Sequence, residues 1–148
     1  MMNKVECSEK CFLRGFNCAQ AVFSTYSSEL GLDTELALRI AGGFGGGMGL
    51  IGETCGAVTG AIMLIGLKHG KVVAEDDAAK EKTYALVQEY KRRFMDLHGS
   101  VRCTELLGFD ISKKDEMLQA RESGLFKSLC PRLVKDSALI VEELLELT

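Results

Sequence analysis

The sequence predicts an all-α protein: a single compact bundle of about six helices, with a glycine-rich loop before the central helix. Helix-start residues repeatedly precede apolar residues at helical spacing, and no stretch has the alternating pattern of a β-strand. The 148 residues contain one proline. With 47% hydrophobic residues, the chain can bury a sizeable core, so we expect one domain covering residues 1–148.

Three helices are expected in the first third of the chain. The first covers residues 3–13 and ends before Gly15. The second begins at Asn17, where Asn17 and Gln20 have the spacing of a capping box, in which each side chain bonds the other residue's backbone N–H. The third opens at Asp33, an N-cap residue type, and ends at a pair of glycines.

A glycine-rich loop and the central helix follow. Residues 42–52 contain seven glycines. This is more than a turn needs, so we expect the loop to approach a ligand or helix closely, or to form an N–H-lined anion pocket. The helix expected over residues 53–67 carries Gly56 and Gly60. Each costs about 1 kcal/mol of helix propensity, which close packing against another helix would offset.

The remaining elements are one long helix, two short segments and a last helix. The long helix covers residues 77–98 and ends at Gly99. Its apolar stripe contains Tyr84, Val87, Phe94 and Leu97. A short helical turn is expected at 103–108, started by Ser100, and a polar loop with one short helix at 109–125. The last helix opens at Pro131, since proline is favoured at the first helical position.

Charge and hydropathy limit the partners and the location. The net charge is −3 and the basic residues are dispersed, so we expect no nucleic-acid binding. The N-terminus lacks the apolar stretch of a secretory signal. The most apolar segment, residues 54–67, is about 14 residues long, whereas a membrane span needs roughly 20. We therefore expect a cytoplasmic protein without membrane insertion that binds small molecules or proteins; a homo-oligomer is compatible with the sequence.

Four cysteines lie at or near expected helix starts. They are Cys18, Cys55, Cys103 and Cys130. Unpaired backbone N–H groups and partial positive charge at a helix start favour the thiolate, which is the reactive and metal-binding form. The simpler alternative is that each is a packed apolar thiol. Recurrence at four helix starts favours function, and the expected reducing compartment argues against a disulfide scaffold.

Cys55 is the centre of the expected site. It follows the glycine-rich loop directly, in the first turn of the expected central helix, where loop N–H groups can stabilise a thiolate or an inorganic sulfide. The loop residues expected at a cofactor are Gly45, Gly46, Gly47 and Gly49. Cys55 and Cys18 are the candidate catalytic thiols.

The spacing of the four cysteines leaves several chemistries open. No pair has the C-x-x-C spacing of a zinc ribbon or a thioredoxin-like centre. The fold must therefore assemble any joint site. Four converging thiolates can bind a [2Fe–2S] or [4Fe–4S] cluster or zinc, whereas two converging pairs give reversible disulfides.

Two further motifs carry weaker signals. Cys7 and Cys11 are one helical turn apart and are interpreted as incidental or accessory, as resolving thiols or an extra metal contact. Residues 47–52 match the G-x-G-x-x-G dinucleotide fingerprint, with Glu75 at the required separation. That fingerprint must follow a strand, and helix-start signals precede it here, so we do not expect a nucleotide site.

Several charged residues have simple structural interpretations. Glu53 is an acid or base beside Cys55 or, more simply, a partner of the helix dipole. His69 and His98 each precede a glycine at a helix end, where a protonated ring suits the dipole. His98 is the better candidate for a role because Cys103 is close to it in sequence. The run 91–93 fits a solvated helix face.

Five segments spread across nearly the whole chain form a recognisable pattern: residues 15–22, 45–49, 52–60, 103–108 and 130–134. Together they resemble the C-GCAxxG-C-C family of redox-active proteins. The family is defined by a CGAxxG motif, which corresponds to residues 55–60 here, and by four cysteines, which correspond to Cys18, Cys55, Cys103 and Cys130. Similar domains are associated with oxidoreductase or transport genes and with haem in split-Soret-type cytochromes. The resemblance implies electron transfer or metal handling; no C-x-x-C-H motif for covalent haem is present.

We therefore expect a redox-active protein in which the four cysteines bind an iron–sulfur cluster for electron transfer with a redox partner protein or small molecule. One alternative is a thiol–disulfide protein in which Cys55 attacks and another cysteine resolves the mixed disulfide. A second is a zinc-binding or structural module without redox activity.

Overall fold

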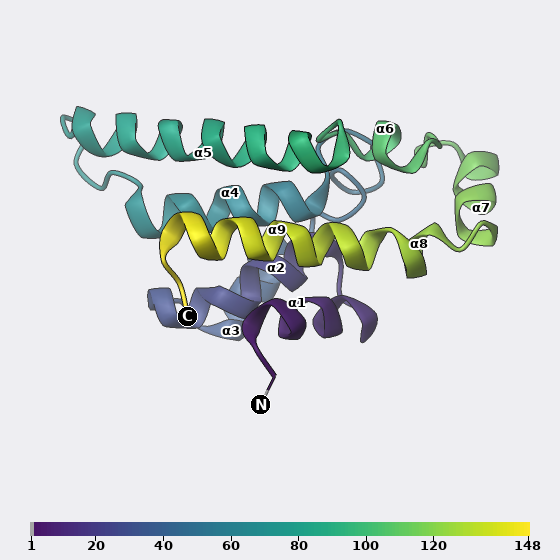
Figure 1. Cartoon of the computed structure of the whole chain (residues 1–148), viewed down its shortest axis with the longest axis horizontal. Coiled ribbons are helices and arrows are strands. Elements are labelled where there is room, and N and C mark those ends of the chain that lie inside the picture. The colour runs from purple at the N-terminus through teal and green to yellow at the C-terminus, as the bar shows by residue number, and fades with distance from the viewer. Residues whose placement is uncertain (1) are drawn as a thin grey trace.

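A computed structural model describes residues 2–148 (Figure 1). Over these residues the chain is all-helical and contains no β-strand, which confirms the predicted fold class. The α-helices are α1 (Lys4–Leu13), α2 (Cys18–Ser27), α3 (Thr34–Ala41), α4 (Gly56–His69), α5 (Asp77–His98), α6 (Cys103–Leu107), α7 (Lys114–Glu122), α8 (Leu125–Ser128) and α9 (Cys130–Leu145), with one 3-10 helix at Ser28–Leu30. The expected number of about six is too low.

The helices pack around α4, which contacts α2, α5 and α9. In Figure 1, α5 forms the upper edge, α1 and α3 form the lower edge, and α2, α4 and α9 lie between them. The short helices α6, α7 and α8 gather at one end of the bundle (Figure 1). No helix in the described part of the chain has both the length and the apolar character needed to cross a membrane.

Polar side chains at the helix starts explain where several helices begin. Asn17 accepts a hydrogen bond from the Gln20 backbone N–H at 2.8 Å, and the Gln20 side chain accepts one from the Asn17 N–H at 3.0 Å, so the predicted capping box is confirmed. Asn3 makes the same reciprocal arrangement at α1. Asp33 and Asp76 cap α3 and α5. These bonds satisfy N–H groups that lack a partner within the helix.

The central helix begins later than expected, at Gly56 instead of residue 53. Cys55 is its N-cap residue and does not lie in the first turn. The preceding residues are extended because Thr54 forms an isolated antiparallel bridge with Arg102. This backbone pairing competes with helix formation and delays the start of α4.

The buried face of α5 differs from the expected stripe. Phe94 is buried, but Tyr84 and Leu97 are 58% and 60% exposed. Tyr90, which was not in the predicted stripe, is fully buried instead. The reason is that α5 lies at the edge of the bundle and packs mainly against α4 and α9, so only a narrow face of the helix is buried. The 91–93 run lies on the solvated face, where Arg92 pairs with Glu89 at 2.7 Å.

The segment that was expected to be a loop with one short helix contains α7 and the beginning of α8. Its side chains form a small second core with α6 and the start of α9. The buried members of this core are Cys103, Leu107, Ile111, Ala120 and Cys130. Ser100 was expected to start this helix, but the N-cap residue of α6 is Arg102. This second core closes one end of the bundle over two of the four cysteines.

Candidate functional site

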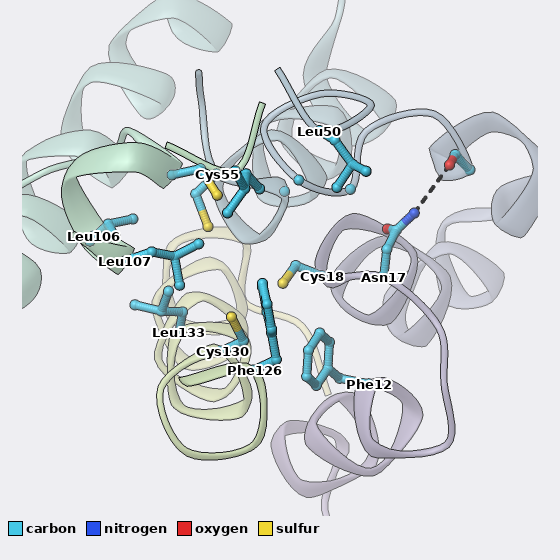
Figure 2. Close-up of a pocket in the computed structure, with 16 residues that line it drawn as sticks. Phe12, Asn17, Cys18, Leu50, Cys55, Leu106, Leu107, Phe126, Cys130 and Leu133 are labelled. Carbon is cyan, nitrogen blue, oxygen red and sulfur yellow. Dashed lines mark hydrogen bonds between the residues drawn. The ribbon is translucent and has the colours of Figure 1, made fainter. Parts of the chain in front are cut away.

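The four cysteines at helix starts line a single pocket of about 310 Å³ (Figure 2). Cys18 begins α2, Cys55 precedes α4, Cys103 begins α6 and Cys130 begins α9. All four are free thiols. In Figure 2 the sulfur atoms of Cys18 and Cys130 point into the same space. The fold therefore brings together four thiols that are up to 112 residues apart in sequence (130 − 18).

The walls of this four-cysteine pocket are apolar. The apolar side chains in the wall are Phe12, Leu50, Leu106, Leu107, Ile111, Phe126 and Leu133. No charged side chain lines the pocket, and its polar side-chain contribution other than sulfur is Asn17. The Asn17 side chain donates a hydrogen bond to the Gly42 carbonyl at 3.1 Å, which ties the start of α2 to the end of α3 (Figure 2). Charged thiolates here receive little stabilisation from water.

Backbone pairing fixes Cys55 relative to Cys103. The Cys55 N–H donates to the Val101 carbonyl at 2.8 Å, and the Cys103 N–H donates to the Glu53 carbonyl at 2.6 Å. These two bonds flank the Thr54–Arg102 bridge. The pairing joins segments 48 residues apart (102 − 54). Neither segment carries a local sequence signal that predicts it.

The surroundings of Cys55 favour its thiolate form. A hydrogen bond from the Cys18 thiol lowers the pKa of Cys55, and the backbone N–H groups of Ala57 and Val58 lower it further, although burial acts in the opposite direction. Both N–H groups belong to the first turn of α4, and the Val58 N–H also donates to the Cys55 carbonyl at 3.0 Å. The helix start therefore acts on Cys55 as the sequence predicts for a thiol at that position.

Cys18 and Cys103 are held in the neutral form. Hydrogen bonds from Cys18 to Cys130 and to Cys55, together with burial, raise the pKa of Cys18 well above its ordinary value. Burial raises the pKa of Cys103 to about 12, with a contribution from the negative charge of Cys55 and Cys130. Position at a helix start therefore predicts the direction of the pKa shift correctly for Cys55 but wrongly for Cys18 and Cys103. Desolvation and thiol–thiol interactions outweigh the helix dipole there.

The glycine-rich loop packs directly on the cysteine-bearing segments. Gly45 and Gly46 line the pocket. A Cβ on Gly45 would lie 2.5 Å from the Asn17 Cβ, and a Cβ on Gly47 would lie 2.8 Å from the Cys103 Cβ. A Cβ on Gly49 would meet only one atom within 4 Å, the Gly43 carbonyl oxygen at 3.9 Å. Close backbone approach thus explains the glycines at 45 and 47, while cofactor binding by the loop stays a prediction.

Other candidate residues from the sequence lie away from the pocket. Glu53 is exposed and its side chain approaches Arg102 at 3.4 Å. The Nε2 atom of His98 lies 2.9 Å from an Asp136 carboxylate oxygen, and neither His98 nor His69 lines the pocket. Cys7 and Cys11 are also absent from its walls. Within residues 2–148, no three His, Cys, Asp or Glu side chains are grouped to hold a single metal ion.

A known protein family matches the part of the chain that carries the four pocket cysteines. The family model described as "Putative redox-active protein (C_GCAxxG_C_C)" matches residues 16–144. The matched region includes all four pocket cysteines and begins after Cys7 and Cys11. No curated protein and no solved structure matches the chain.

Proposed function

Because the chain belongs to the C-GCAxxG-C-C family of redox-active proteins, we propose that Cys18, Cys55, Cys103 and Cys130 bind an iron–sulfur cluster that transfers electrons. The supporting observation is that four thiols from four helix starts line one apolar pocket of about 310 Å³. Four cysteine thiolates are the usual ligand set of [2Fe–2S] and [4Fe–4S] clusters.

Zinc is the alternative metal for four cysteine ligands. A single zinc ion needs four sulfur ligands about 2.3 Å from one centre, whereas in a cluster different iron atoms bind different cysteines. Metal and sulfide analysis distinguishes the two.

The protonation states of the thiols fit a positively charged centre. The pKa of Cys18 is raised by its hydrogen bonds to Cys130 and Cys55 and by burial, and that of Cys103 is raised mainly by burial; repulsion between the thiolates adds to both. Bound iron would offset that repulsion, so binding would release protons. Cys55, whose pKa is lowered, would be available as a thiolate ligand more readily than Cys18 or Cys103, whose pKa values are raised.

The chain around the pocket would tune and protect such a centre. When bound, the cluster supplies one-electron transfer. The aromatic and aliphatic wall excludes water, and the Ala57 and Val58 N–H groups stay directed at the Cys55 sulfur. Burial and hydrogen bonds to sulfur are the protein's means of setting the reduction potential. A reducing compartment such as the cytoplasm would keep the thiols available.

Anaerobic purification followed by iron, acid-labile sulfide and zinc analysis tests this proposal. We expect coloured protein containing iron and sulfide. Single substitutions to serine at Cys18, Cys55, Cys103 or Cys130 should lower the iron and sulfide content, whereas Cys7→Ser, outside the pocket, should leave both unchanged. Protein that contains zinc, or no metal, after anaerobic purification and reconstitution with iron and sulfide would refute the cluster.

A second candidate function rests on the contact between Cys18 and Cys55. The Cys55 thiolate, with its lowered pKa, would attack a disulfide substrate, and Cys18 would displace the substrate from the mixed disulfide. Two electrons would pass to the substrate, and a Cys18–Cys55 disulfide would form. This predicts colourless protein in which mild oxidation removes two free thiols, and peptide mapping would locate the disulfide.

A further inference from the structure

Cys7 and Cys11, which the four-cysteine pocket does not use, line a separate groove on α1. This groove of about 440 Å³ also contains Lys4, Lys10 and Arg14 of α1 and is closed by hydroxyl-bearing residues of α2 and residue 34. It shares no lining residue with the four-cysteine pocket. We call it the α1 groove.

The α1 groove is positively charged. Cys7, Lys10, Cys11 and Arg14 stand at positions i, i+3, i+4 and i+7, so they share one face of the helix. No Asp or Glu lines the groove. Lys4 pairs with Glu29 at one end. Among the ion pairs of the described residues, none includes Lys10 or Arg14, so both charges are available to an anion.

The two thiols of the α1 groove differ in their surroundings. Cys7 is exposed, whereas Cys11 is 7% exposed and its Sγ atom lies 4.0 Å from the Ser24 Oγ atom. Residues i and i+4 of a helix have Cβ atoms about 5–6 Å apart, and a disulfide needs about 3.5–4.5 Å. An intact α1 therefore disfavours a disulfide between Cys7 and Cys11, and an external partner is the accessible reactant for Cys7.

We propose that the α1 groove binds an anionic low-molecular-weight disulfide and that Cys7 forms a mixed disulfide with one half of it. The carboxylates of the ligand would lie beside Lys10 and Arg14, which places its sulfur atoms near Cys7. This assignment does not depend on the chemistry of the four-cysteine pocket.

The reaction is a thiol–disulfide exchange. The Cys7 thiolate attacks one sulfur atom of the ligand, the ligand's S–S bond breaks, and a new S–S bond to Cys7 forms. The other half leaves as a thiolate, which takes up a proton from water. The Cys7 sulfur is oxidised and the leaving sulfur is reduced, so no other oxidant is needed. Excess free thiol reverses the reaction.

Three disulfides of similar size test the proposal on the full chain: 3,3′-dithiodipropionate, which is anionic, 2-hydroxyethyl disulfide, which is neutral, and cystamine, which is cationic. Mass spectrometry of peptides gives the rate of adduct formation at Cys7. Each rate is divided by the rate of the same disulfide with N-acetylcysteinamide, because the three leaving thiols differ in reactivity. We expect the normalised rate to follow anionic > neutral > cationic, with a severalfold gap at each step at low salt that shrinks at high salt.

Matched charge variants identify the groove. In Lys10→Gln/Arg14→Gln, we expect the anionic probe to react no faster than the neutral one after normalisation. The exposed pair Lys113→Gln/Lys114→Gln, on a different part of the surface, removes the same charge and should leave the preference intact. Equal normalised rates for anionic and neutral probes in the unmodified chain would overturn the proposal. So would an unchanged preference in Lys10→Gln/Arg14→Gln, or a Cys7–Cys11 disulfide as the product.

Discussion

Ala19 of α2 and Gly60 of α4 meet with no side chain between their backbones. A Cβ on Gly60 would lie 2.9 Å from the Ala19 carbonyl oxygen and 3.2 Å from its Cα. One turn earlier in α4, a Cβ on Gly56 would lie 3.2 Å from the Cβ of Cys18. The absence of side chains at positions 56 and 60 therefore sets how closely Cys18 approaches Cys55.

Adding a methyl group at this crossing should push the two helices apart. We expect Gly60→Ala to lower the free energy of unfolding by about 1–3 kcal/mol, the usual cost of overpacking. Gly66→Ala is the matched control, because it lies in the same helix with nothing within 4 Å of the added atom. It should raise the free energy of unfolding by up to about 1 kcal/mol through helix propensity. Urea denaturation measures both, and a similar loss in the two variants would contradict the close crossing.

The reactivity of Cys55 should depend on the Cys18 thiol. Because the Cys18 hydrogen bond is the largest cause of the lowered pKa of Cys55, alkylation of Cys55 in metal-free, reduced protein should rise with pH with a midpoint below the ordinary value of about 8.5. Cys18→Ala removes the donor and should move the midpoint upward, whereas Cys18→Ser keeps a hydroxyl donor and should move it less. Iodoacetamide labelling with peptide mapping gives the midpoint. An unchanged midpoint in Cys18→Ala would show that the helix start alone activates Cys55.

Alkaline pH should destabilise the fold through Cys103. Its pKa of about 12 in the folded protein lies above the value of about 8.5 in an unfolded chain. Between these values the folded state binds more protons, so the free energy of unfolding falls as pH rises. At pH 10 the loss from this group should be about 1–2 kcal/mol.

The corresponding measurement compares urea denaturation at pH 7.5 and pH 10 in metal-free, reduced protein. The Cys103→Ala substitution changes the free energy of unfolding at both pH values. The decrease in this free energy from pH 7.5 to pH 10 should nevertheless be smaller in Cys103→Ala than in the unmodified chain. Equal decreases would assign the alkaline loss to other groups, such as the buried Tyr26 and Tyr90, whose pKa values are also raised.

A buried chain of hydrogen bonds joins α5, α9 and α4. The Tyr90 hydroxyl and the Ser137 Oγ atom lie 2.6 Å apart, and Ser137 donates to the Ala57 carbonyl at 2.6 Å. Ser137→Ala should cost about 1–3 kcal/mol because it leaves a buried Tyr90 hydroxyl without its partner. Tyr90→Phe should cost less, since Ser137 keeps Ala57. Urea denaturation of both variants checks the order, and the reverse order would contradict this account of the hydrogen bonds.

Most of the helix boundaries could be predicted because they depend on local chemistry. Asn17 with Gln20, Asp33 and Gly99 mark helix ends through bonds and backbone angles within a few residues. One short helix was expected within residues 109–125, but the bounds of α7 were not predicted because its N-cap residue, Lys113, makes no side-chain capping bond. The sequence around α7 is polar, so neither a capping residue nor an apolar periodicity indicated where this helix begins and ends.

The site was predictable as a set of residues but not as a geometry. Position at a helix start picks out Cys18, Cys55, Cys103 and Cys130, and the structure places all four on one pocket. The raised pKa values of Cys18 and Cys103 arise from burial and from other thiols distant in sequence. The groove beside Cys7 likewise requires residues of α2, so the spacing of Cys7 and Cys11 alone pointed only to a shared helix face.

The bridge between Thr54 and Arg102 has a consequence for the order of folding. The chain between these residues is the α4–α5 hairpin, and closing so long a loop is entropically costly until the hairpin has docked. We therefore expect Cys55 and Cys103 to come together only after this hairpin has formed, and Cys130 to join them when α9 packs against α1 and α4. A partly folded chain would present the same sulfur atoms one at a time, dispersed and open to solvent. The four-thiol site would therefore exist only in the fully folded chain.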